Sequence, residues 1–246
     1  MKYTVKYLFL LLPLLVAACA DDDDEVAPNT SNSNGTPIAE GLTSNSEATD
    51  SQGNTYTVGL DQVQSDNQDP FVRKVDANGD EVWRYTYEST PVDGRAVLVT
   101  IDAEGNPWVV FTVDGGSNDN DYISKKRIQE GAFSNVYANS YGSGGGPKVS
   151  IITQIDAERG EIMKGTFVTA RTNDGRTNTL EITKIGFNEG NLAFEISSSA
   201  WPPGEGTSYQ RFPDITDEDR INNRFKIYYE INLALSEITE AVLLNE

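Results

Sequence analysis

The chain has 246 residues, with 38 acidic against 19 basic side chains and a formal net charge of −19 at neutral pH. Such a surface repels phosphate backbones, so we expect no nucleic-acid partner. The sequence contains no histidine, which excludes catalysis by a histidine base and removes the commonest zinc ligand. Cys19 is the only cysteine, so the chain has no pair for an internal disulfide.

Residues 1–18 have the features of a secretory signal peptide. Lys2 and Lys6 give a positive head, and an apolar run follows from Tyr7 to Ala18. The run is shorter than the roughly 20 apolar residues that a membrane-spanning helix needs. A positive head, a short apolar core and small residues at its end predict export and cleavage.

The residues at the predicted cleavage point are Val16, Ala17, Ala18 and Cys19. This stretch resembles the lipobox of bacterial lipoproteins. The resemblance implies that Cys19 becomes the acylated, palmitate-carrying first residue of the mature protein, and lipidation would account for a lone thiol in an exported chain. Two or three acyl chains give stable membrane attachment, whereas one gives only marginal binding. The alternative is an ordinary signal peptide whose cysteine lies at the cut by chance.

An acidic block, Asp21–Glu25, follows the cysteine almost at once. It is either a solvated spacer or, as it resembles, the export signal of surface lipoproteins in Bacteroidota-type bacteria. The second interpretation predicts a lipid anchor in the outer membrane, with the protein on the cell surface. Residues 19–46 as a whole are acidic and then rich in Asn, Ser, Thr, Gly and Pro, which predicts a disordered tether.

Residues 47–246 are predicted to form a repeated β domain. Asp50, Asp76 and Asp102 stand 26 residues apart, each in a short Asp/Asn/Gly segment beside an alternating apolar segment. Weaker copies lie at 126–131, 153–160 and 183–190. Each copy is typical of two strands joined by a tight turn, in which Asp bonds to the backbone and Gly accepts a positive φ.

Two such hairpins make a four-stranded unit of about 52 residues. Residues 50–59 and 70–79 of this unit resemble the bacterial seven-bladed propeller repeat known as SBBP, which implies propeller blades. The fold class is therefore predicted to be all-β, built of antiparallel β-hairpin repeats and β-propeller-like. Because six hairpins and a tail supply too few strands for four blades, an up-and-down barrel or a β-sandwich stays open. Residues 236–244 fit either a helix or a final strand.

The segments between hairpins are predicted to be long loops gathered at one end of the sheets. They are residues 89–94, 114–121, 139–147, 172–178 and 199–207. Tyr141, among glycines, and Trp201, beside Pro202 and Pro203, lie in such loops, where binding residues on a rigid scaffold collect. These two rings are the candidate binding residues, and a ring folded onto its own loop is the alternative. Trp83 and Trp108 are expected in the core.

The repeated aspartates invite a catalytic interpretation, but their fixed place in each turn favours a structural role. No catalytic residue and no metal ligand is predicted. No cofactor is expected; the alternative is calcium in the loop 114–121, which is rich in oxygen ligands. The spacing Asp76, Asn78, Asp80 begins like an EF-hand, but Glu81 and Tyr87 occupy the positions of its glycine and closing glutamate.

The expected function is therefore that of a surface-anchored lipoprotein without catalytic activity, which binds a polysaccharide or protein partner or serves a structural role. Its membrane contact comes from the N-terminal lipid. Two alternatives stay open. A carboxylate-dependent glycoside-active enzyme needs no histidine and predicts two carboxyl groups about 5 to 9 Å apart. A calcium-stabilised adhesion module predicts a melting temperature that calcium raises.

Overall fold

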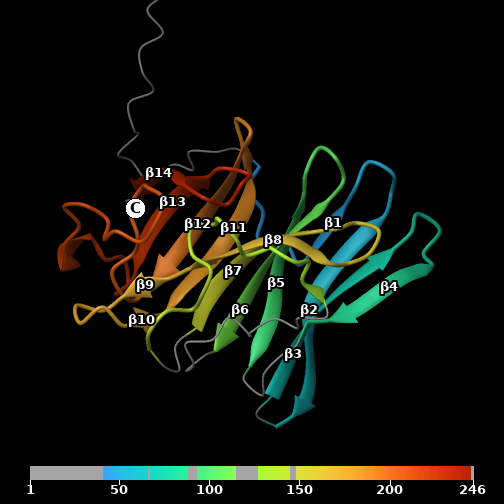
Figure 1. Ribbon diagram of the computed structural model, residues 1–246, viewed down its shortest axis with the longest axis horizontal. Helices are drawn as coiled ribbons and strands as arrows, with labels where there is room; N and C mark the ends of the chain where they lie inside the picture. Colours follow the sequence, from blue (N-terminus) through green and yellow to red (C-terminus); the bar gives the residue numbers. More distant parts are fainter. Residues whose placement is uncertain (1–40, 66, 88–92, 115–126, 145–147, 245–246) are drawn as a thin grey trace, which may run out of the picture. The chain divides into compact units, whose positions relative to one another are not determined.

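The computed structural model describes residues 41–65, 67–87, 93–114, 127–144 and 148–244 (Figure 1). The predicted signal peptide, Cys19, the acidic block and the tether up to residue 40 lie outside this part of the chain. So does most of the predicted calcium loop. All of the described residues belong to one unit of the fold, residues 32–246.

The described residues form antiparallel sheets and contain no α-helix, which confirms the all-β prediction. Three sheets have four strands each, paired in chain order. We call them sheet I, sheet II and sheet III. Sheet I comprises β1 (Glu47–Thr49), β2 (Thr55–Gln64), β3 (Asn67–Val75) and β4 (Glu81–Thr86). Sheet II comprises β5 (Gly94–Ile101), β6 (Pro107–Asp114), β7 (Lys148–Ile155) and β8 (Ile162–Val168). Sheet III comprises β11 (Leu180–Asn188), β12 (Asn191–Ser198), β13 (Phe225–Ile231) and β14 (Ile238–Leu243).

A short ribbon of β9 (Ala170–Arg171) and β10 (Thr177–Asn178) connects sheets II and III. The C-terminal segment left open by the sequence is a strand, β14. In each four-stranded sheet the first strand does not pair with the last, so none of these sheets closes into a barrel.

The tight turns predicted at the aspartates are confirmed, and they share one hydrogen-bond pattern. In the first turn, the Asp50 N–H donates to the Asn54 carbonyl at 2.9 Å, and the Gly53 N–H donates to the Asp50 carbonyl at 3.1 Å. One Asp50 carboxylate oxygen also accepts the N–H groups of Gln52 and Asn54. The turns at Asp76, Asp102 and Asp156 repeat the arrangement, the last with one residue more. These carboxylates therefore hold turns, as the structural interpretation expects.

Two further turns have this hydrogen-bond pattern but no aspartate at its first position. One of the hairpins predicted from the sequence is wrong. Thr172 and Asn232 occupy the aspartate position in the turns β9–β10 and β13–β14. Residues 172–178, predicted as a long loop, are thus mostly a tight hairpin. The predicted hairpin at 126–131 is absent from its described residues, 127–131. Ile128 instead makes a parallel bridge to Ile162 along the edge of β8.

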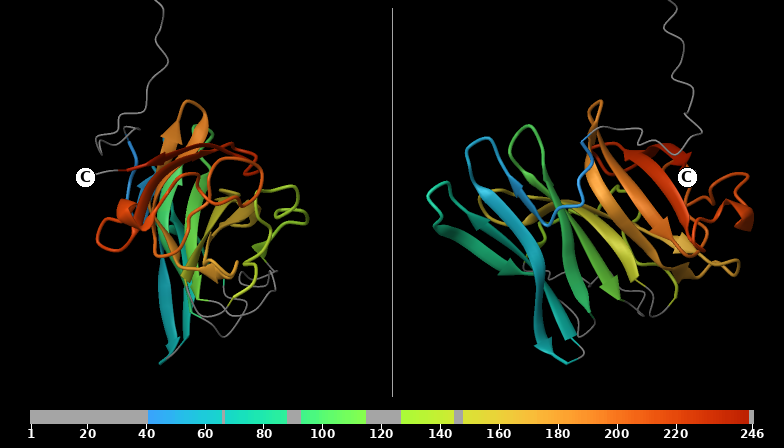
Figure 2. Two further views of the ribbon diagram at one scale, coloured as in Figure 1. Left: turned by 90° about the vertical axis from the view of Figure 1, so that its left-hand side faces the viewer. Right: turned by 180° about the vertical axis from the view of Figure 1, so that it is seen from behind.

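Sheet II lies between the other two sheets and is buried on both faces (Figures 1 and 2). In β6, Trp108 and Val110 pack toward sheet III, while Val109 and Phe111 pack toward sheet I. All four are almost fully buried. An unbroken apolar run is what a strand covered on two sides requires, since alternate side chains enter different cores.

The outward faces of sheets I and III carry charged pairs, and on sheet III these lie on the same face as a small apolar cluster of Ala193 and Tyr228 with Leu42 and Val242. On sheet I, Phe71 covers Gly59, and the Arg84 guanidinium lies 4.0 Å from the Phe71 ring centroid and pairs with Asp61. Sheet III carries the ion pair Lys184–Glu195. Packing these two faces together would desolvate several charges at a cost of several kcal/mol each. The blade-like sheets therefore do not continue as a ring.

An N-terminal clasp, residues 42–49, pairs with the first strands of sheets III and II and forms the first strand of sheet I. Thr43 pairs with Ile185 of β11, with N–O distances of 2.8 and 2.9 Å. The Asn45 carbonyl accepts the Val99 N–H of β5 at 3.0 Å, and residues 47–49 then form β1. Figure 2 shows this blue segment passing from sheet III to sheet I. Residues 42–46, predicted as part of the tether, thus belong to the folded domain.

Candidate functional site

The connection between β12 and β13, residues 199–224, is the longest connection that the structure describes in full. Several backbone contacts fix its path. Residues 202–204 pair with residues 210–212 through Gly204 N–H to Gln210 carbonyl and Phe212 N–H to Pro202 carbonyl, at 2.7 and 2.9 Å. Gly206 pairs with Ile238 of β14. Because β9 holds Trp201 and β14 holds Gly206, the first part of this loop is a fixed support for side chains.

Trp201 lies at the start of this loop and is half-buried. Its backbone exchanges two 3.0 Å hydrogen bonds with Arg171 of β9, and its ring packs against Phe225 with centroids 5.2 Å apart. The Arg211 guanidinium carbon lies 3.3 Å from the Trp201 ring centroid, and the Arg220 guanidinium carbon lies 5.3 Å from it. Trp201 is therefore a base on which arginine side chains rest, and its ring is not an open stacking surface.

A second aromatic ring, that of Tyr209, supports another arginine, Arg171. The Tyr209 hydroxyl donates to the Trp201 carbonyl at 3.0 Å, and the Arg171 guanidinium carbon lies 4.2 Å from the Tyr209 ring centroid. Burial raises the pKa of Tyr209, and the charges of Arg171 and Arg211 oppose that rise. We refer to Arg171, Trp201, Tyr209, Arg211 and Arg220 as the Trp201 platform.

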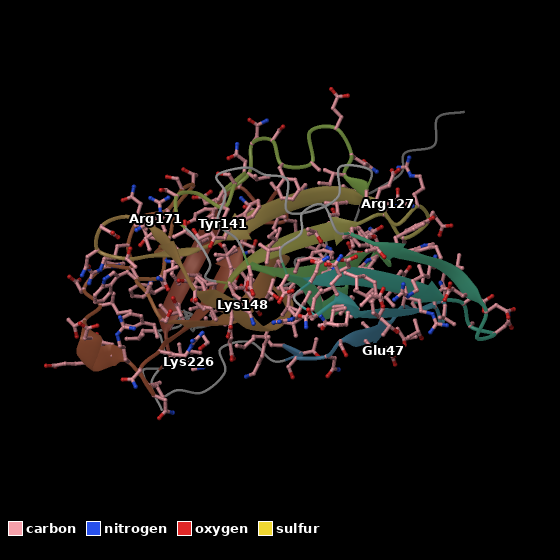
Figure 3. The ribbon with its side chains drawn as sticks, turned by 90° about the horizontal axis from the view of Figure 1, so that it is seen from below. Glu47, Arg127, Tyr141, Lys148, Arg171 and Lys226 are labelled. Carbon is pink, nitrogen blue, oxygen red and sulfur yellow. The ribbon has the colours of Figure 1, made fainter. Side chains whose placement is uncertain are left out.

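The arginines of the platform differ in whether a nearby carboxylate neutralises their charge. Arg220 Nε pairs with Asp217 at 2.7 Å. Among the residues that the structure describes, the arginines with no carboxylate oxygen within 4.0 Å are Arg127, Arg171, Arg176 and Arg211. Arg171 and Arg176 belong to the β9–β10 hairpin, and Arg211 belongs to the loop 199–224. Figure 3 shows Arg127 well apart from Arg171. Two guanidinium groups of the platform, those of Arg171 and Arg211, therefore have no carboxylate of a described residue within 4.0 Å, whereas Arg176 lies outside the platform and its charge acts on Asp174.

A pocket of about 320 Å³ opens beside the platform. Arg211, Gln210 and Glu205 supply its charged and polar wall, and Phe212 and Ala241 contribute apolar surface. A polar hollow of about 530 Å³ lies along the β9–β10 turn, lined by Thr172, Asp174 and Arg176 among others.

Of the two predicted binding residues, the structure keeps only Trp201 near the surface. Tyr141 is fully buried in the core between sheets I and II, and its carbonyl accepts the Thr177 hydroxyl at 2.8 Å. The expectation of an exposed Tyr141 ring is therefore wrong, because the glycine-rich segment folds this ring inward. The expectation that Trp83 and Trp108 are core residues is confirmed.

One close pair of carboxyl groups occurs on the outward face of sheet III, where Glu230 and Glu240 are direct cross-strand neighbours. Glu230 accepts hydrogen bonds from Asn188, Asn191 and Tyr228 at 2.6 to 2.9 Å. Burial alone would raise the pKa of Glu230, but these donors lower it below its ordinary value. Burial and the neighbouring Glu230 charge raise the pKa of Glu240.

Glu240→Gln is expected to stabilise the protein at neutral pH. The pKa of Glu240 is higher in the folded than in the unfolded chain, so its ionised form disfavours folding above the folded pKa. That cost disappears as the pH falls and Glu240 becomes protonated. Thermal unfolding should show a gain of about 0.5 kcal/mol at pH 7 and none at pH 3. The exposed Glu237→Gln serves as the control; an equal gain at both pH values would contradict the pair repulsion.

No group of three or more acidic or cysteine side chains in the described ranges has a geometry that could hold a metal ion. Within the same ranges, no helix has the length and apolar character needed to cross a bilayer. Comparison of the sequence with protein-family models and with curated proteins found no match.

Proposed function

We propose that this protein is a lipid-anchored protein of the bacterial outer membrane that faces outward and acts as a non-catalytic binding module for a polymer. The observation that carries the proposal is the Trp201 platform with its adjoining pocket. The platform combines uncompensated charge, a half-buried aromatic base and a loop fixed to the sheets at several points. Binding sites on rigid β scaffolds are built from such loops.

The lipobox-like segment ending at Cys19 and the acidic residues after it support the cellular location. They precede the clasp at residues 42–49, so a surface anchor would hold the domain through its N-terminal side. Arg171 and Arg211 have no carboxylate of a described residue within 4.0 Å and so supply local positive charge on a strongly acidic chain, which suits a specific local contact and not general adhesion.

Cys19→Ser tests the anchor. The wild-type chain should partition into detergent and incorporate labelled palmitate, whereas the variant should lose both properties completely, because serine offers no thiol for acylation. Intact-mass measurement of the mature N-terminus checks the modification directly. An unmodified Cys19 in the membrane fraction would contradict the proposal.

The outward orientation has its own test, since it depends on the acidic block and not on the lipid. Replacing residues 21–25 by serine should keep the palmitate label but abolish cleavage of the protein by trypsin added to intact cells. Equal trypsin cleavage of the wild-type and variant chains would contradict an export role for residues 21–25.

Binding is tested by affinity electrophoresis of the full chain, in detergent, through gels that contain neutral or acidic polysaccharides. Retardation by at least one polymer, lost in Trp201→Ala, is expected. A chain that migrates freely in every gel would contradict the binding role.

Cleavage of glycosides is the second candidate function, and the Glu230–Glu240 pair is where it can be tested. Enzymes of this class use two carboxyl groups with different pKa values about 5 to 9 Å apart, whereas Glu230 and Glu240 differ in pKa but share a hydrogen bond. If the candidate is correct, the purified chain releases reducing ends from one of the same polysaccharides, and Glu240→Gln abolishes the release. If the wild-type chain is inactive, glycoside cleavage is contradicted and only the binding function remains proposed.

A further inference from the structure

We infer that the Trp201 platform recognises an acidic saccharide, a polymer of uronic acid units, through the guanidinium groups of Arg171 and Arg211. This inference rests on the proposed binding function and names the ligand class. The geometry behind it lies in how the two arginines are held and in what surrounds them.

Aromatic rings restrict the position of each guanidinium group. The guanidinium carbon of Arg211 lies 3.3 Å from the Trp201 ring centroid, and that of Arg171 lies 4.2 Å from the Tyr209 ring centroid, so each cation is held over an aromatic face. Arg211 uses one N–H for the Ile215 carbonyl at 3.3 Å. A planar fork of this kind matches the two oxygens of a carboxylate and loses little rotamer entropy on binding.

The pocket beside Arg211 favours a saccharide over an acidic peptide. Its wall offers donors, Arg211 and Gln210, together with an acceptor, Glu205. An aspartate or glutamate side chain brings only acceptors, and Glu205 would repel it. A uronate unit brings a carboxylate for the guanidinium and hydroxyl donors for Glu205. The volume of about 320 Å³ accommodates one sugar ring.

The repeated charge of the polymer fits the spread of arginines. The Trp201 backbone pairs with Arg171 while its ring supports Arg211, so successive carboxylates of one chain have more than one cationic partner in this region. Distant acidic residues oppose this contact little, because charges more than about 8 Å away are largely screened at physiological ionic strength. Of the nearer acids, Asp217 is paired with Arg220, and Glu205 lies on the pocket wall.

The test compares oligogalacturonate hexamer with its methyl ester by titration calorimetry of the full chain in detergent. The ester keeps the sugar skeleton and removes the charge. We expect the acid to bind at least tenfold more tightly than the ester. Arg211→Ala and Arg171→Ala should each weaken acid binding about tenfold, since each removes a charge-assisted hydrogen-bonding group. Arg73→Ala, which removes an arginine paired with Glu81 on sheet I, is the matched control and should change nothing.

Other outcomes overturn the inference. Equal affinity for the acid and the ester, with sensitivity to Trp201→Ala, would leave the binding function standing and remove the acidic ligand. Binding of poly-glutamate but not of the hexamer would assign an acidic peptide instead. Unchanged acid binding in both arginine variants would place the contact elsewhere. Arg211→Lys keeps the positive charge but removes the planar guanidinium group. An affinity close to that of the wild type would contradict recognition by a guanidinium group held on an aromatic ring.

Discussion

Gly160→Ala should destabilise the protein by about 3 kcal/mol, clearly more than Gly175→Ala, although each glycine immediately precedes the closing residue of its turn; the two turns differ in length by one residue. Both have a positive φ, 63° and 82°. A Cβ at residue 175 would meet no atom within 4 Å, whereas one at residue 160 would lie 2.5 Å from the Tyr85 ring. The Gly175 variant therefore measures backbone strain alone, about 1 kcal/mol.

Tyr85 has little room to move away. Its ring stacks on Trp83 with centroids 5.3 Å apart, and the Arg127 guanidinium carbon lies 3.4 Å from its centroid. The Gly160 carbonyl also accepts the Tyr87 hydroxyl at 2.6 Å, so the turn joins sheets I and II at this point. Chemical denaturation of the two variants gives the comparison. In a double-mutant cycle, Tyr85→Ala should relieve part of the Gly160→Ala loss. Equal losses at 160 and 175 would contradict the contact.

Trp108→Ala should cost about 4 kcal/mol and lower the melting temperature by about 10 °C. Trp108 is 1% exposed in the core between sheets II and III. Its ring meets Phe187 edge-on, and its Nε1–H donates to Asp102 at 2.9 Å. The substitution therefore opens a large cavity and removes a donor from the turn carboxylate.

Two further variants separate these contributions. Trp108→Phe keeps most of the ring volume and loses the N–H, so it should cost about 1 kcal/mol. Trp201→Ala removes the same atoms from a half-buried loop position and should cost much less than Trp108→Ala. Calorimetric melting of the three variants checks the order. A loss at Trp108 no larger than that at Trp201 would show that the core collapses around the cavity.

The sequence was sufficient to predict the turns because Asp and Gly each perform a specific task there. It missed the turns at Thr172 and Asn232, where other residues perform the same tasks. Leu235 occupies the glycine position with a φ of 55°, since its fully buried side chain offsets the unfavourable backbone conformation. The false copy at 126–131 has the right composition, but its backbone groups pair with β8.

The number of layers could be recognised only in part. The apolar run of β6 indicates burial on both faces, whereas β13, which alternates apolar and polar residues, is also almost wholly buried. The sequence does not reveal that three sheets stack in chain order with sheet II in the centre, because that arrangement depends on side-chain packing between distant strands.

The candidate site, like the fold, could be predicted only in part from the sequence. The aromatic residue among prolines, Trp201, was identified from its local context. Its arginine partners come from residues 171, 211 and 220, and only the pairing of β9 with the loop brings them together. Tyr141 has an equally suggestive context among glycines, but local sequence does not determine whether a ring in a loop points outward or inward.

The clasp at residues 42–49 determines how the domain responds to tension on its N-terminal side. Drag on a cell-surface domain held from that side would load the Thr43–Ile185 pair first, then the Asn45–Val99 bond, and then the three-residue pairing of β1 with β2. Such small groups of bonds rupture one after another at low force. The domain would lengthen by the released segment while the core between sheets I and II and the core between sheets II and III remain intact.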